Sequence, residues 1–196
     1  MNLWHDLPPG PDWPRVIYVV VEIPKKSRTK YEYDEQGGFL RLDRVLFSSL
    51  HYPGDYGFIP QTLHTDGDPL DVLVLVSEPT FPGCVIEARP LGIFHLLDKG
   101  QLDDKILAVP HRDPLFSGYR ALADVPPHFL EEVAHFFSVY KDLESVKVVG
   151  QGWEGRARAF LEIEQAVARY QEQHPASLSA SSTPPHRDEH ETDGAR

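Results

Sequence analysis

The chain has 196 residues, enough for one substantial hydrophobic core but too few for two full-sized domains. Hydrophobic residues make up 41% and charged residues 25%, a globular composition that argues against a disordered or a membrane protein. The formal net charge of -11 would repel a nucleic-acid backbone, so we expect no nucleic-acid partner.

The single cysteine, Cys84, excludes an intramolecular disulfide and Cys-rich metal sites, and it favours a reducing cytoplasm. The first nine residues lack the basic and apolar regions of a secretory signal. No run reaches the roughly 18 apolar residues of a membrane-spanning helix. We therefore expect a cytoplasmic protein with no membrane partner.

Strand and turn patterns dominate residues 15–153. Residues 16–23 are rich in β-branched and aromatic side chains and stop at Pro24, as in a buried strand. The pair Gly37-Gly38 is typical of a hairpin connection between two further strands. The remaining strands are predicted at residues 31–33, 39–42, 72–76, 85–97 and 105–109.

Helical patterns come later in the chain. Apolar residues recur at spacings of three and four between Pro126 and Leu143, which predicts one apolar helical face. A second helix is predicted from Glu154 to about Gln173. Many short strands followed by helices favour an α+β fold with a mainly β core, a closed or nearly closed barrel flanked by C-terminal helices.

Residues 175–196 lose apolar periodicity and become rich in Ser, Pro and charged residues. We expect this segment to be a disordered tail. The preceding residues, 1–174, are then expected to form one catalytic domain.

Residues 66–71 have the sequence DGDPLD and place three carboxylates in one turn. Asp, Gly and Pro are ordinary turn residues, so an isolated Asp-Gly-Asp is better explained as a polar turn. A calcium-binding EF-hand loop counted from Asp66 fails at three positions. The addition of Pro69 and of a third carboxylate, Asp71, which directly precedes an apolar strand, weakens the plain-turn interpretation.

A second acidic cluster contains Asp98, Asp103 and Asp104 and lies between two apolar strands. Alone it is typical of a solvated loop. Together with residues 66–71 and the strand residue Glu22, it supplies enough oxygen ligands for more than one Mg²⁺ ion. Several metal ions in one site imply a highly anionic substrate.

Cationic and hydroxyl side chains complete the set. Each is ordinary by itself: Lys141 suits a helix C-terminus, and Arg44 is placed to pair with a neighbouring carboxylate. Only their joint occurrence favours a functional role for these side chains. They are Lys30, Arg44, Lys105, Tyr140 and Lys141.

Over almost all of residues 16–153, the sequence resembles the family I soluble inorganic pyrophosphatases. Long matching stretches are YPGDYGFIP at 52–60, DGDPLD at 66–71 and HFFSVYKDLE at 135–144. Shorter matches are EIP at 22–24, KYE at 30–32, Asp43-Arg44, Asp98 with Asp103 and Lys105, and AVP at 108–110.

The resemblance implies an OB-like five-stranded β-barrel that uses several Mg²⁺ ions to hydrolyse pyrophosphate to two phosphates. It also implies Mn²⁺ or Zn²⁺ as substitute metals. A homo-oligomer is the implied assembly, with a hexamer favoured.

The resemblance further assigns roles by motif position. Asp68 would be the base that faces the attacking water, and Tyr56 would line that water. Metal ligation is implied for Glu22, Asp66, Asp71, Asp98 and Asp103. Phosphate binding is implied for Lys30, Arg44, Lys105, Tyr140 and Lys141.

Two alternatives stay open. A Mg²⁺-dependent hydrolase of nucleotides or polyphosphate would need a base-binding pocket, for which the sequence has no clear signal, and the chain has no P-loop. A non-catalytic OB-type module that binds oligonucleotides needs a basic groove with exposed aromatic residues, whereas the turns of this chain are acidic.

Overall fold

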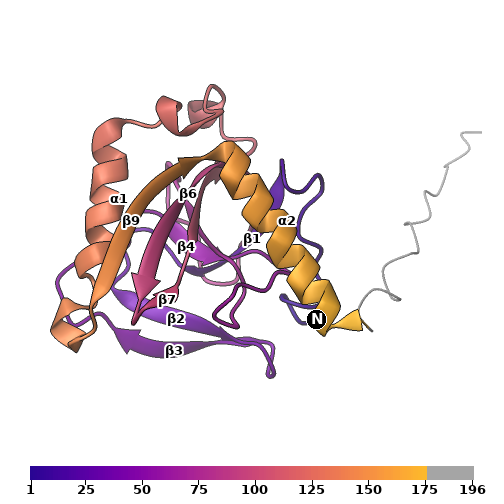
Figure 1. The fold of residues 1–196 in the computed structure, drawn as a ribbon, viewed down its shortest axis with the longest axis horizontal. Helices are drawn as coiled ribbons and strands as arrows, with labels where there is room; N and C mark the ends of the chain where they lie inside the picture. The colour runs from indigo at the N-terminus through magenta and orange to yellow at the C-terminus, as the bar shows by residue number, and fades with distance from the viewer. Residues whose placement is uncertain (176–196) are drawn as a thin grey trace, which may run out of the picture.

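Five strands close a ring in the computed structural model, which describes residues 1–175. β1 (Ile17–Ile23) pairs antiparallel with both β4 (Asp55–Phe58) and β6 (Val85–Asp98). β5 (Asp71–Val74) pairs with β4 and lies parallel to β8 (Lys105–Pro110), which in turn pairs with β6. The ring confirms the expected five-stranded barrel (Figure 1).

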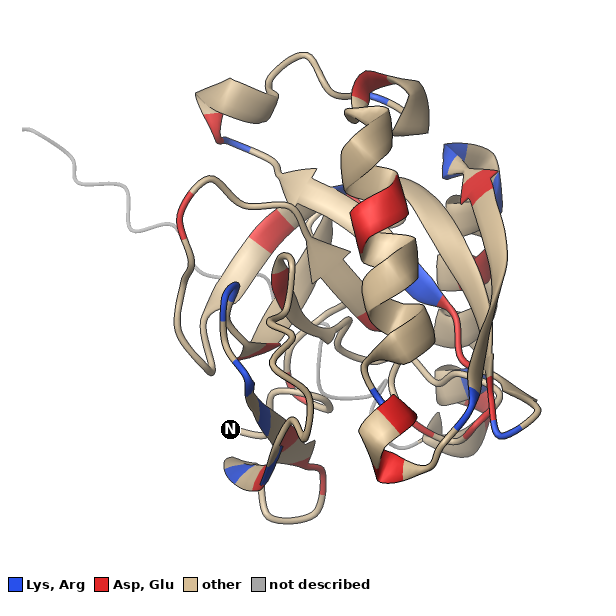
Figure 2. Cartoon of the chain, turned by 90° about the vertical axis from the view of Figure 1, so that its left-hand side faces the viewer, with Lys and Arg blue, Asp and Glu red and all other residues tan. Residues whose placement is uncertain are grey.

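β6 carries two more strands beyond the ring. β7 (Gln101–Leu102) folds back on its end, and β9 (Val148–Gly155) runs antiparallel beside residues 92–98. A separate hairpin of β2 (Thr29–Asp34) and β3 (Phe39–Val45) lies below the barrel in Figure 1. Charged segments of both signs alternate along this hairpin in Figure 2.

Both predicted helices are present, with shorter bounds. α1 (Pro127–Val139) ends before Leu143 because the chain turns into a 3₁₀ segment, η3 (Asp142–Glu144). α2 (Arg156–Gln173) begins two residues later than predicted because Glu154 still pairs with β6. Two other 3₁₀ turns, η1 (Pro114–Phe116) and η2 (Leu122–Asp124), precede α1.

The expectation for residues 175–196 falls, apart from Pro175, outside the described residues. Within residues 1–175, no helix is long and apolar enough to cross a bilayer.

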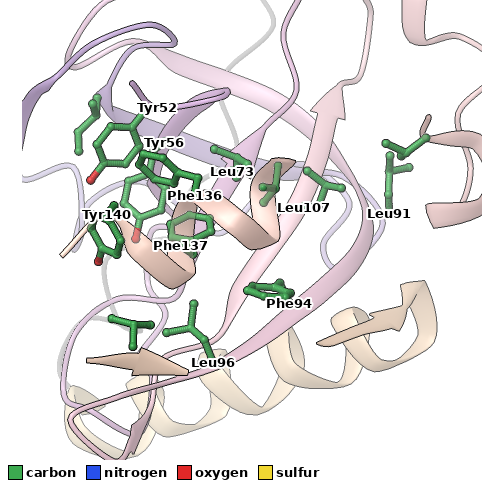
Figure 3. Close-up of a cluster of buried hydrophobic side chains, with 14 of the residues drawn as sticks. Tyr52, Tyr56, Leu73, Leu91, Phe94, Leu96, Leu107, Phe136, Phe137 and Tyr140 are labelled. Atoms are coloured by element: carbon green, nitrogen blue, oxygen red, sulfur yellow. The ribbon is translucent and has the colours of Figure 1, made fainter. Parts of the chain in front are cut away.

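The apolar runs of β5 and β8 are buried on both faces. Val72 and Ile106 pack in one cluster with apolar residues of α2, whereas Leu73 and Leu107 pack in another with α1. Figure 3 shows the second cluster, with the aromatic rings of Tyr52, Tyr56, Tyr140, Phe136 and Phe137 gathered at one end. Double-sided burial explains why these strands are continuously apolar instead of alternating.

The sequence patterns did not predict β4 or β9. The four residues of β4, DYGF, include no β-branched side chain, and β9 contains three glycines. Glycine weakens strand propensity and often marks a bulge or a close backbone approach. Both strands form because neighbouring strands supply their hydrogen-bond partners.

Gly57 of β4 is a position of close approach between strands. A Cβ atom there would lie 1.9 Å from the carbonyl oxygen of Val20 and 2.9 Å from the Cα atom of Val21. Any larger residue would push β4 away from β1. The neighbouring residues Tyr56 and Glu22 lie on these same two strands.

We predict that Gly57→Ala lowers the free energy of unfolding by about 1–3 kcal/mol or more, because overpacking forces the backbone to shift. Urea denaturation followed by circular dichroism measures the change. Gly118→Ala is the matched control, since nothing lies within 4 Å of a Cβ atom at Gly118. Equal stabilities of the two variants would contradict the predicted clash.

Candidate active site

An open pocket of about 940 Å³ lies between the barrel, the β2–β3 hairpin and the end of α1. Ten of its lining residues are Asp or Glu and six are Lys or Arg, so the lining is acidic but contains many cations. All the site residues predicted from the sequence line it. They are Glu22, Lys30, Arg44, Tyr56, Asp66, Asp68, Asp71, Asp98, Asp103, Lys105, Tyr140 and Lys141.

The turn at residues 66–71 is closed by its own backbone. The amide of His64 donates to the carbonyl of Asp68 at 2.7 Å, and the amide of Asp68 donates to Oδ1 of Asp66 at 3.1 Å. Gly67 has a φ of +100°, a conformation that side chains rarely adopt. The turn thereby presents several carboxylates to the pocket from a short segment.

Asp71 and Asp103 meet at Lys105. The parallel register of β5 and β8 places Asp71 opposite Lys105, whose ammonium group contacts the carboxylates of both Asp71 and Asp103. Burial acts to lower the pKa of Lys105, but Asp71 and Asp103 outweigh burial and raise it. Tyr56 also donates to Oδ2 of Asp71 at 2.6 Å.

Glu22 enters the pocket from an irregular point in β1, where the pairing with β4 shifts between Val21 and Ile23. Its Oε1 accepts a hydrogen bond from the amide of Tyr33 at 2.7 Å. Burial and the nearby charge of Asp71 raise the pKa of Glu22 to about 8. A cation near this carboxylate would stabilise its charged form and so offset both the burial and the repulsion from Asp71.

Asp98 lies at the end of β6 and accepts a hydrogen bond from Nζ of Lys141 at 2.5 Å. Its other oxygen, Oδ1, is buried and has no hydrogen-bond partner among the described residues. A buried, unsatisfied carboxylate oxygen is costly and therefore calls for a ligand. The Lys141 ammonium also lies 5.2 Å from the centroid of the Tyr140 ring.

The hairpin contributes two cations that are already paired with acids. Nζ of Lys30 contacts Glu32 and lies 3.4 Å from Oδ2 of Asp43. The guanidinium of Arg44 donates to both oxygens of Glu144, at 3.0 and 2.8 Å. These pairs fix the cations at the pocket rim.

Asp68 shares one property with Glu35 that the other pocket carboxylates lack: it accepts no hydrogen bond from residues 1–175. Partial burial, followed by the charges of Asp66 and Asp71, raises its pKa. The Asp68 carboxylate is thus available to accept a proton, and its pKa is raised above the ordinary value of an Asp side chain.

The donor set fits a hard divalent cation. The pocket offers carboxylate oxygens without thiolate or imidazole ligands in its lining, which is the chemistry that Mg²⁺ prefers. Within the described part of the chain, no three His, Cys, Asp or Glu side chains already form a metal cluster by themselves. The ammonium groups of Lys105 and Lys141 instead contact three of the candidate ligands.

Sequence reasoning missed several pocket residues and their neighbours. Glu32 and Glu144 lie inside the matching stretches 30–32 and 135–144, so the motifs contained a signal for them. His64 lies outside the matching stretches, so the sequence contained no indication of a role for it. Burial lowers its pKa, but Asp104 and Asp66 outweigh burial and raise it to about 9.

The sequence model of the inorganic pyrophosphatase family matches residues 19–171. The chain belongs to this family. The resemblance to the family I soluble enzymes, noted from the motifs, is therefore confirmed.

Relatives with this family name cover most of the chain. An inorganic pyrophosphatase of Haloferax volcanii is 51% identical over 173 residues, which are 88% of this chain and 98% of the relative. One from Halalkalibacterium halodurans is 52% identical over 157 residues, 80% of this chain and 96% of the relative. The crystal structure of inorganic pyrophosphatase from Thermus thermophilus has a TM-score of 0.84 at 42% identity, covering 87% of this chain and 99% of that one.

We predict that stability of the metal-free protein falls as pH rises from about 4.5 to about 8, in part because of Glu22. The folded state binds the Glu22 proton more strongly than the unfolded state, so this stabilisation is full below the ordinary pKa and is lost through the raised one. Glu22→Gln removes the titration and should lose less stability over that range.

Urea denaturation in the presence of a chelator measures the effect at each pH. Glu131→Gln on the exposed surface of α1 is the control. The same pH dependence in Glu22→Gln and in the unsubstituted protein would contradict the raised pKa.

Proposed function

We propose that this protein is a metal-dependent inorganic diphosphatase that hydrolyses pyrophosphate to two phosphates by in-line attack of water. The observation that carries the proposal is the convergence of all the predicted site residues on one pocket. These residues come from strands, loops and a helix end that are far apart in the sequence. Membership of the inorganic pyrophosphatase family supports the same activity.

The charge of the pocket supports a small, highly anionic substrate accompanied by cations. Ten acidic residues would repel pyrophosphate by themselves, so its charge must be neutralised by bound metal ions and by the pocket's own cations. Lys30, Arg44 and Lys141 line the pocket and act on phosphate oxygens. Arg44 does so with a planar fork, the lysines as point charges.

We propose Mg²⁺ as the metal, in several copies, with Mn²⁺ or Zn²⁺ as substitutes. Glu22, Asp66, Asp71, Asp98 and Asp103 would hold these ions. A divalent cation, when bound, supplies Lewis acidity that makes water more acidic and neutralises charge on phosphate oxygens.

Asp68 is proposed as the general base. Its unengaged carboxylate and raised pKa support this role, because an efficient base has a pKa near the working pH. Tyr56, whose hydroxyl donates to Oδ2 of Asp71 at 2.6 Å, would line the water beside Asp68. Lys105 and Tyr140 line the same pocket and would offer phosphate oxygens a positive charge and a hydroxyl donor.

The alternatives have less support. The lining of the pocket includes Tyr31, Tyr33, Phe58 and the polar groups above, and its acidity disfavours an oligonucleotide in the absence of metal. Hydrolysis of nucleotides or longer polyphosphates is a matter of substrate preference in the same site.

Three further expectations remain proposals. Residues 1–174 would act as one catalytic domain in a cytoplasmic protein. The assembly would be a homo-oligomer, with a hexamer favoured. Exposed apolar side chains at Leu42, Val45 and Phe47 support association between copies.

We predict rapid phosphate release from pyrophosphate with Mg²⁺ and much slower release from ATP, because the pocket cations bind phosphate oxygens and the sequence has no clear signal for a base-binding pocket. A colorimetric phosphate assay with each substrate at equal concentration measures the preference. Equal or faster release from ATP would contradict the substrate assignment.

Asp68→Asn is expected to reduce turnover by a factor of about 10² to 10⁴, the usual effect of losing an acid-base group. Metal binding and the circular dichroism spectrum should stay close to those of the unsubstituted protein. Asp12→Asn, which affects an exposed ion pair with Arg15, is the matched control. Turnover that is unchanged in Asp68→Asn would assign the base to another residue.

A further inference from the structure

A buried polar cluster lies next to the 66–71 turn but outside the lining of the pocket. Its three members, His64, Asp104 and Glu162, are each only 4% exposed. None of them has a role in the proposed reaction. Burying these groups is costly unless they are paired, so the arrangement needs a reason.

His64 lies between two acidic side chains. Its Nδ1 atom is 3.6 Å from Oδ1 of Asp66, and its Nε2 atom is 3.7 Å from Oδ2 of Asp104. Both ring nitrogens therefore face a carboxylate. The backbone of His64 also accepts from the amide of Gly67 at 3.2 Å, so ring and backbone act on the same turn.

Other side chains hold the two acidic members of the cluster, Asp104 and Glu162, in place. Nδ1 of His95 lies 2.8 Å from Oδ1 of Asp104. Glu162 of α2 lies 4.0 Å from Nε2 of His64 and is itself held by Arg158 and Arg169 at 2.9 and 2.6 Å. The ring of His64 is thus enclosed by groups that have other partners.

The chain positions of these acids link two segments of the pocket. Asp66 belongs to the 66–71 turn, whereas Asp104 lies between Asp103 and Lys105. The side chain of His64 lies between the two segments and is not part of the pocket lining. Its ring connects the segments that contain Asp66 and Asp103, two of the proposed metal ligands.

We propose that His64 is a positioning residue that holds Asp66 in place relative to the 103–105 segment and thereby increases the affinity for a divalent cation. The inference rests on the metal site of the proposed function. Groups that orient metal ligands typically contribute a factor of about 10 to 100 in metal affinity. A purely structural His64 would affect stability alone.

The test measures the dissociation constant for Mn²⁺ by electron paramagnetic resonance of free Mn²⁺, using the purified full chain. His64→Gln should weaken binding about tenfold. At saturating metal its turnover should stay within about twofold, because His64 does not touch the substrate. Circular dichroism verifies that the variant is folded.

His95→Gln is the matched control. His95 contacts Asp104 and Glu154 but not Asp66, so its loss should change Mn²⁺ affinity by less than about threefold. Unchanged affinity in His64→Gln, or an equal loss in His95→Gln, would overturn the proposal. An unsubstituted protein that binds no Mn²⁺ would instead refute the metal site itself.

Asp104→Asn tests the same connection from its other end. If His64 acts through the bridge to Asp104, the double variant should bind Mn²⁺ no more weakly than the weaker single variant. Fully additive losses would contradict the bridge. If His64→Gln does not fold, Asp104→Asn decides alone: weaker Mn²⁺ binding supports the proposal, and unchanged binding overturns it.

Discussion

Asp71 and Asp103 share the ammonium group of Lys105, and this contact is the constraint on which the pocket depends. Carboxylates gathered in a partly buried pocket repel one another, and desolvation adds to the cost of their charge. The raised pKa values of Glu22 and Asp68 are the measure of that cost. Fixed cations reduce the repulsion enough for the protein to fold, and divalent ions are expected to reduce it further.

The barrel supplies the geometry for this contact. β5 and β8 are the parallel pair of the ring, and their register sets Asp71 opposite Lys105. Both strands are packed on two faces by clusters that include α1 and α2, so the register cannot slip without exposing apolar side chains. The aromatic end of the α1 cluster carries Tyr56 (Figure 3). The hydroxyl of Tyr56 donates to Asp71. Packing and electrostatics therefore fix the position of the same residue, Asp71.

The sequence predicted the strands whose apolar character is strong, such as 16–23, and the family motifs identified every proposed site residue. It missed β4 and β9, because glycines lower the local strand signal and long-range pairing overrides it. It also missed the contact between His64 and Asp104, which are 40 positions apart in the chain and meet only in the folded barrel. Periodicity and motif spacing describe local structure and shared ancestry, whereas a contact of this kind depends on how strands are paired.

The central claim is that the pocket carboxylates serve to hold divalent cations. Crystals soaked in Mn²⁺ and measured at the manganese absorption edge test it directly, because anomalous density locates the ions without reference to any mechanism. The account predicts density in contact with Asp66, Asp71 and Asp103, with the Lys105 ammonium shifted away from at least one of these carboxylates. Well-occupied Mn²⁺ that lies only outside the pocket, with Lys105 still bound to both Asp71 and Asp103, would contradict it.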